Sequence, residues 1–199
     1  MASRAKLSLL RLRPLAFTAL FALLAVLALL GRDQPNLASD DFQKYNGRQF
    51  AVLRVIDGDT ITLNIADGDD SYTTVRLWGL DTPETKAPGK PVAYFGPQAT
   101  RFTTDMVAGR LITLELESEN TRGKFGRLLA FVYTDDNRML NEQLITTGHA
   151  YADDRWRHRF YFRFLQLENL SRKNKLGLWR SVTPDDMPSH VRRRLDLDN

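Results

Sequence analysis

Alternating hydrophobic and polar residues in the middle of the chain predict β-strands. In one run Ile61, Leu63 and Ile65 share a face with a period of two. The turn signal Asp67-Gly68-Asp69-Asp70 ends this run. The three β-rich runs lie at residues 50–56, 60–65 and 72–80. Three consecutive strands with short connections predict an antiparallel meander.

A change to helical periodicity follows the meander. Pro97 is suited to a first helical position, and Gly109 to the residue after a helix end. Between them Ala99, Phe102 and Met106 form one apolar stripe. Later runs predict strands at 111–116 and 128–133 and helices at 141–147 and 159–175. Five short strands and three helices predict an α+β domain built on a five-stranded β-barrel of the OB type.

The first 31 residues have a different character. Basic residues precede an apolar stretch at 15–30 that is broken only by Thr18. A helix of this length spans roughly 24 Å, slightly less than the ~30 Å hydrocarbon core of a bilayer. This pattern predicts a signal peptide or an uncleaved signal anchor, and hence export, with the protein secreted, periplasmic or held at the membrane facing outward. Ala25 and Ala28 offer only a weak cleavage signal, so both outcomes stay open.

The remaining boundaries follow from composition and charge. We expect a polar linker at 32–47, an OB-fold domain at 48–180 and a mobile polar tail at 181–199.

The chain has a net charge of +4, but residues 1–38 carry all of this excess. The body is therefore neutral, and attraction to phosphate must come from local clusters. The chain has no cysteine, so the fold needs no disulfide.

Two acidic clusters are the strongest candidates for chemistry. The first is Asp57-Gly58-Asp59-Thr60 and the second is Asp81-Thr82-Pro83-Glu84. Taken singly, the first is typical of a hairpin turn and the second of a helix cap. Pairing of the second and third strands would bring Asp59 close to Asp81. Two such carboxylates repel each other, and a divalent cation would relieve that repulsion.

Arg76 lies between the clusters and adds a phosphate-binding group. Arg76 and Asp81 are five positions apart, so they would face opposite sides of a regular strand. Both can serve one site only if the strand ends or bends between them. Gly79 is the residue at which we expect that bend.

Several ordered motifs resemble those of the staphylococcal nuclease (thermonuclease) family. The match runs from about Phe50 to Trp179. The motifs are Val55-Ile56-Asp57-Gly58-Asp59-Thr60, Asp81-Thr82-Pro83-Glu84-Thr85-Lys86 with Pro88, Lys90, Val92 and Gly96-Pro97 after it, Gly123-Lys124-Phe125-Gly126-Arg127, and Asn141-Glu142.

The resemblance implies calcium-dependent hydrolysis of DNA and RNA that leaves 3′-phosphate ends. It assigns Asp59 and Asp81 as Ca²⁺ ligands, together with the carbonyl of Thr82. It assigns Glu84 to activate or orient the attacking water. Asp57 is a candidate for setting the ligand loop from outside the coordination shell.

The same resemblance assigns Arg76 and Arg127 to the scissile phosphate. Guanidinium groups fit phosphate bidentately, which an ammonium group does not. The family usually has tyrosine where Phe125 stands, so this ring lacks a hydroxyl donor. The stretch from Tyr151 to Trp156 is shorter than the family's nucleotide pocket, and either aromatic residue could stack on a base. The candidate substrate-binding residues are Lys86, Lys90, Lys124, Phe125 and Tyr151.

An interleaved basic and aromatic run at 155–164 allows two interpretations. Such mixtures bind single-stranded nucleic acids, but Phe160, Phe164 and Leu167 also have the spacing of a helix face packed on the barrel. We expect packing for these three. The competing function for the whole chain is a non-catalytic OB module that binds nucleic acid or protein while tethered to a membrane through residues 15–30. The partners implied are DNA and RNA, with no obligate protein partner.

Overall fold

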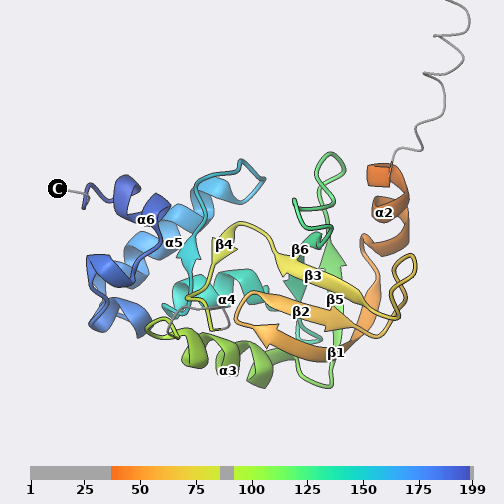
Figure 1. Ribbon diagram of the computed structural model, residues 1–199, viewed down its shortest axis with the longest axis horizontal. Coiled ribbons are helices and arrows are strands. Elements are labelled where there is room, and N and C mark those ends of the chain that lie inside the picture. The colour runs from red at the N-terminus through yellow and green to blue at the C-terminus, as the bar shows by residue number, and fades with distance from the viewer. Residues whose placement is uncertain (1–36, 86–91, 198–199) are drawn as a thin grey trace, which may run out of the picture. The chain divides into compact units, whose positions relative to one another are not determined.

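A closed five-stranded barrel forms the centre of the domain (Figure 1). The computed structural model describes residues 37–85 and 92–197, and all structural statements concern these ranges. The strands are β1 (Gln49–Asp57), β2 (Thr60–Leu63), β3 (Thr73–Leu77), β5 (Leu111–Glu115) and β6 (Leu128–Tyr133). Their order around the barrel is β1-β2-β3-β6-β5. The expected α+β class, five-stranded barrel and antiparallel β1-β2-β3 meander are confirmed.

Alternating residues on these strands fill the barrel interior. Ile61, Leu63, Val75 and Leu77 are fully buried, as the period of two requires. β6 joins β3 in parallel and β5 in antiparallel orientation, and β5 pairs with β1 to close the barrel.

The strand that carries Arg76 ends where the sequence predicted a bend. β3 stops at Leu77, and the two-residue strand β4 (Leu80–Asp81) begins after Gly79, whose φ is +82°. Glycine adopts this conformation at little cost, whereas other residues are strained. β4 leaves the barrel and pairs with β7 (Tyr151–Ala152). The bend that a shared site for Arg76 and Asp81 requires is therefore present.

Three helices lie close to their predicted positions. They are α3 (Gly96–Val107), α4 (Leu140–Thr146) and α5 (Tyr161–Lys173). Pro97 stands in the first turn of α3, and Ala99 and Met106 are buried. Phe164 of α5 is fully buried, and Phe160 and Leu167 pack against the main core. The packing interpretation of these three residues is thus confirmed.

The predicted linker at 32–47 is wrong over its described part. Residues Leu37–Tyr45 form helix α2. Tyr45 is fully buried, and its hydroxyl lies 3.1 Å from that of Thr73. Asp41 forms an ion pair with Arg122, which also contacts Asp67. A mostly polar helix is fixed here by Tyr45, by Phe42 packed against the core and by one ion pair, and these contacts do not produce a strong hydrophobic pattern.

The tail predicted at 181–199 is also wrong over its described part. After the short 3-10 helix η1 (Gly177–Arg180), the described part of the tail forms a second 3-10 helix, η2 (Pro184–Asp186), and then α6 (Ser189–Arg194). Val191 is fully buried in a second cluster with Tyr151 and Trp179, and Arg194 pairs with Glu168. The described residues thus contain five α-helices rather than three, because a polar segment folds back onto the domain.

The predicted signal or anchor at 1–31 lies outside the described residues. Among the helices that are described, none has both the length and the apolar character needed to cross a membrane.

Candidate active site

The pairing of β2 with β3 creates the site at one end of the barrel. Thr60 lies opposite Arg76 in the register, and the amide of Leu77 donates to the Asp59 carbonyl at 2.8 Å. Asp59 occupies the turn before β2, and Asp81 lies just beyond the bend after β3. The sequence prediction that strand pairing would gather the two acidic clusters is correct.

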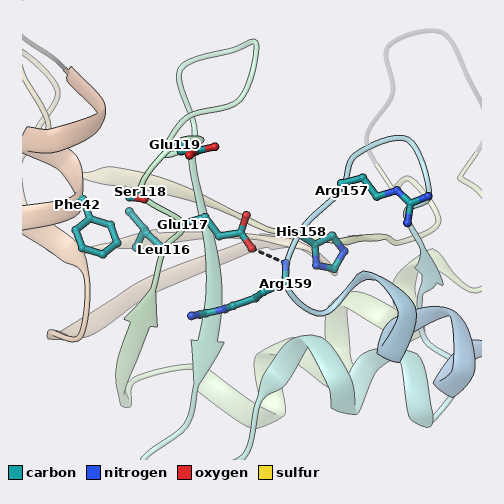
Figure 2. A pocket seen from close by; sticks show the side chains of 8 residues that line it. All are labelled: Phe42, Leu116, Glu117, Ser118, Glu119, Arg157, His158 and Arg159. Carbon is teal, nitrogen blue, oxygen red and sulfur yellow. Dashed lines mark hydrogen bonds between the residues drawn. The ribbon is translucent and has the colours of Figure 1, made fainter.

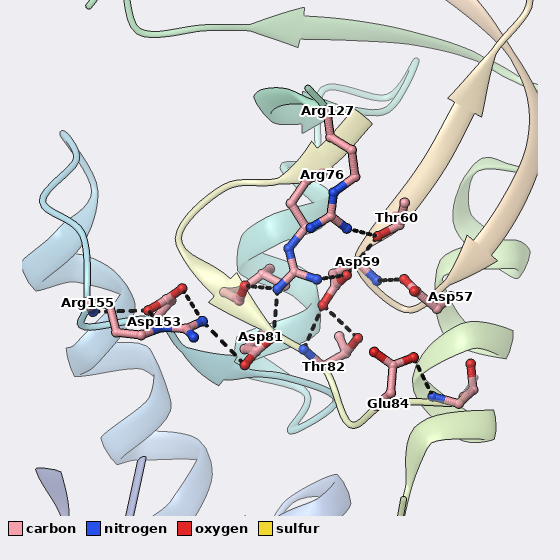
Figure 3. Close-up of polar contacts among 12 residues, drawn as sticks. Asp57, Asp59, Thr60, Arg76, Asp81, Thr82, Glu84, Arg127, Asp153 and Arg155 are labelled. Carbon is pink, nitrogen blue, oxygen red and sulfur yellow. Dashed lines mark hydrogen bonds and ion pairs between the residues drawn. The ribbon is translucent and has the colours of Figure 1, made fainter. Parts of the chain in front are cut away.

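Asp59 is buried and held by hydrogen bonds from both sides (Figure 3). The Thr82 amide and hydroxyl each donate to its Oδ2 at 2.9 Å, and the Thr60 hydroxyl donates to Oδ1 at 3.0 Å. Gly58 is essential to this approach, since a Cβ there would lie 2.8 Å from the Thr82 hydroxyl oxygen. The carboxylate is consequently fixed before any ligand arrives.

Arg76 joins the two acidic clusters. Its Nη1 forms an ion pair with Asp59, and its Nη2 donates to Asp81 Oδ1 at 2.7 Å and to the Leu80 carbonyl at 3.1 Å. Burial alone would lower the pKa of Arg76, but Asp59 and Asp81 outweigh it and raise that pKa. The arginine is permanently charged and aligned by the two carboxylates that were predicted as metal ligands.

The site carries more negative charge than Arg76 compensates. Burial, reinforced by the charge of Asp59, raises the pKa of Asp57 to about 7. Burial also raises the pKa of Asp81, with Arg76 opposing this shift and Asp59 adding to it. Carboxylate oxygens are the ligands that a hard divalent cation prefers, and Asp59 and Asp81 both supply them around Arg76. The residues present therefore fit Ca²⁺.

Thr82 and Glu84 continue from β4 along the edge of this site. Thr82 contacts Asp59 through its amide and hydroxyl, so its observed role is to orient that carboxylate. Glu84 is exposed, and its Oε1 accepts the Thr85 amide hydrogen at 3.1 Å. Figure 3 shows the Glu84 side chain beside Thr82, at the margin of the carboxylate cluster. This is an accessible position for a base that acts on water.

Arg127 approaches from the segment before β6. Its Nη1 donates to the Thr60 hydroxyl at 3.3 Å, and that hydroxyl in turn donates to Asp59. A second arginine is thereby connected to the carboxylates through one side chain. Phe125 is 77% exposed, and both Arg127 and Lys124 lie 5.8 Å from its ring centroid. These three residues remain available to a substrate, whereas Lys86 and Lys90 lie outside the described residues.

The sequence did not reveal Arg155. Its Nη2 lies 3.5 Å from Asp81 Oδ2, while its guanidinium binds both oxygens of Asp153 at 2.7 and 2.8 Å. The Asp-x-Arg spacing was the one available signal. It stood in the basic and aromatic run at 155–164, which was interpreted as a whole, so no single arginine was distinguished.

Tyr151 is a correction to the predicted substrate-binding set. It is fully buried in β7, and its ring packs edge-on against Trp179 at 5.3 Å. A ring beneath the C-terminal segment cannot stack on a base. Trp156, by contrast, is 66% exposed on the loop that carries Arg155. Of the two aromatic residues left open by the sequence, only Trp156 is available for stacking.

Other hollows lie elsewhere on the domain. A cavity of about 550 Å³ is lined by Phe42 and by residues 116–119 and 157–159, where the Arg159 amide donates to Glu117 (Figure 2). It contains none of the predicted site residues. A smaller pocket of about 310 Å³ includes Arg127 and Phe125. Within the described ranges, the group of three potential metal ligands that lie together is Asp153, Asp154 and His190.

Comparison with known proteins places these features in context. The family described as Staphylococcal nuclease homologue matches residues 74–181. The chain is 35% identical over 135 residues to the thermonuclease of Staphylococcus hyicus and 38% identical over 140 residues to that of Staphylococcus intermedius; each match covers 67% of this chain and 77% of the relative. It is 34% identical over 130 residues to the endonuclease YncB of Bacillus subtilis strain 168, covering 63% of this chain and 59% of that protein.

Proposed function

Because the chain belongs to the staphylococcal nuclease family, we propose that it is a calcium-dependent endonuclease that hydrolyses DNA and RNA to 3′-phosphate ends. The observation that carries this proposal is the arrangement of Asp59, Arg76 and Asp81. Two carboxylates for a cation and a guanidinium for a phosphate meet within one hydrogen-bonded cluster. Such a combination suits the cleavage of a phosphodiester.

Asp59 and Asp81 are the proposed holders of Ca²⁺. When bound, the ion would polarise a phosphoryl oxygen as a Lewis acid. Thr60 and Thr82 keep the Asp59 carboxylate in one orientation through their hydrogen bonds. This orientation reduces the rearrangement that the protein must undergo when it meets its substrate.

Arg76 and Arg127 are the proposed partners of the scissile phosphate. In the absence of substrate, Arg76 is held by two carboxylates and Arg127 by the Thr60 hydroxyl. Both guanidinium groups can present paired N–H donors to the phosphate as negative charge develops on its oxygens. Contacts to phosphate carry no information about base or sugar, which supports action on both DNA and RNA.

Glu84 is the proposed base. Its carboxylate would accept a proton from the attacking water, whose oxygen forms the new bond to phosphorus as the 5′ oxygen departs. The departing 5′ oxygen takes up a proton from solvent water, so the products carry a 3′-phosphate on one side and a 5′-hydroxyl on the other. Base catalysis of this kind contributes about 10²–10⁴-fold. Trp156, exposed near Arg155, supplies a ring for stacking beside the reacting phosphate.

The test is hydrolysis of single-stranded DNA and of RNA by the full-length chain, with Ca²⁺ or with a calcium chelator. We expect cleavage of both substrates with Ca²⁺ and none with chelator, and phosphatase should release phosphate from the 3′ ends. Asp81→Asn should abolish activity. Asp105→Asn is the matched control, because Asp105 is 70% exposed on α3 and pairs only loosely with Arg101. Undiminished activity in chelator, or no activity in either condition, would refute the proposal.

We also propose that the apolar segment at 15–30 directs the protein out of the cytoplasm, as a cleaved signal or as a membrane anchor. Its support is the basic start followed by the apolar run. Carbonate extraction of membranes separates anchored from released protein, and mass analysis of the mature N-terminus detects cleavage. Recovery of the intact chain in the cytosolic fraction would contradict export.

A further inference from the structure

A second cluster of potential metal ligands lies beside the proposed active site. Asp153 and Asp154 follow β7, and His190 lies in α6. One ligand atom of each side chain lies within 4.8 Å of the others. None of these residues belongs to the proposed calcium site, and the C-terminal fold that brings His190 here was not predicted.

The state of His190 distinguishes this cluster from an ordinary group of surface acids. The residue is only 6% exposed, and its Nε2 is buried without a hydrogen-bond partner among the described residues. The Oδ1 atom of Asp154 is likewise buried without such a partner. Buried polar atoms in folded proteins are nearly always satisfied, so these two unpartnered atoms require an explanation.

We propose that Asp153, Asp154 and His190 form a second metal site, which binds a transition-metal ion such as Zn²⁺. An imidazole with two carboxylates is a donor set that Zn²⁺ accepts, with water completing a tetrahedral shell. The nitrogen ligand separates this site from the all-oxygen cluster at Asp59 and Asp81, which suits a hard cation. The ion would fasten α6 to the loop that follows β7.

Two arginines occupy the carboxylates when no ion is bound. Arg155 holds both oxygens of Asp153, and Arg194 Nε lies 3.5 Å from Asp154 Oδ2. A cation must therefore compete with Arg155 for Asp153. Since Arg155 also reaches Asp81, a bound ion would loosen a contact to the proposed active site. Zinc binding is thus coupled to the position of Arg155.

Equilibrium dialysis of the full-length chain against Zn²⁺, followed by metal analysis, tests this proposal without any nucleic acid. The result is independent of nuclease activity. We expect one bound Zn²⁺ per chain, and still one in Asp81→Asn, which impairs the proposed calcium site and keeps all three proposed Zn²⁺ ligands. His190→Gln and Asp154→Asn should each weaken binding at least about 100-fold, since each removes a direct ligand. Matched controls are His149→Gln and Asp185→Asn, which should bind as the unmodified chain does.

Two further measurements keep the test decisive even if His190→Gln or Asp154→Asn misfolds. Co²⁺ added to the unmodified chain should give the intense visible absorption of a four-coordinate site, a result that depends on no substitution. Arg155→Gln should tighten Zn²⁺ binding by about tenfold, because it removes the competitor for Asp153. The proposal is overturned if the unmodified chain binds no Zn²⁺. It is equally overturned if folded His190→Gln and Asp154→Asn bind Zn²⁺ as tightly as the unmodified chain.

Discussion

Substitution of Gly79 by alanine tests whether the bend between β3 and β4 assembles the site. A Cβ at this position would lie 2.5 Å from His158 Nε2 and 2.9 Å from Phe164 Cε2. The positive φ of +82° costs an alanine about 1–2 kcal/mol, and the crowding adds about 1–3 kcal/mol. We therefore expect Gly79→Ala to lower the free energy of unfolding by about 2–5 kcal/mol.

Gly109→Ala separates the cost of the positive φ from the cost of steric crowding. Gly109 has a φ of +69°, but a Cβ there would meet no atom within 4 Å. This variant should lose only the backbone contribution, about 1–2 kcal/mol. Urea unfolding in the presence of chelator measures both values.

Activity titrations with Ca²⁺ then report on the site itself. Gly79→Ala should need a higher Ca²⁺ concentration for half-maximal activity, because Asp81 shifts relative to Arg76. Gly109→Ala should match the unmodified chain. Equal losses of unfolding free energy in the two variants, together with unchanged Ca²⁺ requirements, would refute the assignment of the bend as the element that builds the site.

Further substitutions examine single groups. Glu84→Gln should lower kcat about 10²–10⁴-fold, and Arg127→Lys about 10²-fold or more, with unchanged circular dichroism; wild-type rates in both would contradict their roles. Burial lowers the pKa of His158 from its usual 6.5 to about 4. Between these pH values the folded state binds fewer protons than the unfolded state, so the free energy of unfolding falls as the pH drops. His158→Gln should therefore reduce the dependence of unfolding free energy on pH between 6.5 and 4, and an unchanged slope would exclude this origin. Asp41→Asn should cost about 1–2 kcal/mol in urea unfolding by weakening the pair with Arg122, which keeps Asp67, whereas the exposed Asp40→Asn should cost little; equal losses would show that the pair does not anchor α2.

Local patterns were sufficient to predict the barrel and the approach of Asp59, Arg76 and Asp81 to one another. A period of two in the apolar residues, as at Ile61 and Leu63, indicates a strand. Short connections between such strands allow few ways of pairing them. Once β2 pairs with β3, Asp59 must lie near the end of the strand that carries Arg76. Even the bend at Gly79 followed from requiring Arg76 and Asp81 to serve one site.

Residues that depend on distant partners escaped prediction. α2 is held by Tyr45 and by the Asp41–Arg122 pair, and such contacts leave no periodic signal in the sequence. Tyr151 was assigned to substrate because nothing local shows that Trp179 and α6 cover it. Arg155 owes its place to Asp153 and to the pairing of β4 with β7, which is tertiary information.

The strand order around the barrel also bears on how the chain acquires its activity during synthesis. β1, β2 and β3 pair as sequence neighbours, but β6 must cover the open edge of β3, and β5 that of β1. Until Tyr133 has been added, the growing chain exposes unpaired strand edges, which favour association with other chains. Asp59, Arg76 and Asp81 all precede this point, whereas Arg127 arrives with β6. A ribosome-bound fragment that ends before Arg127 therefore contains the acidic half of the proposed centre without its second arginine, which precedes the strand that completes the barrel.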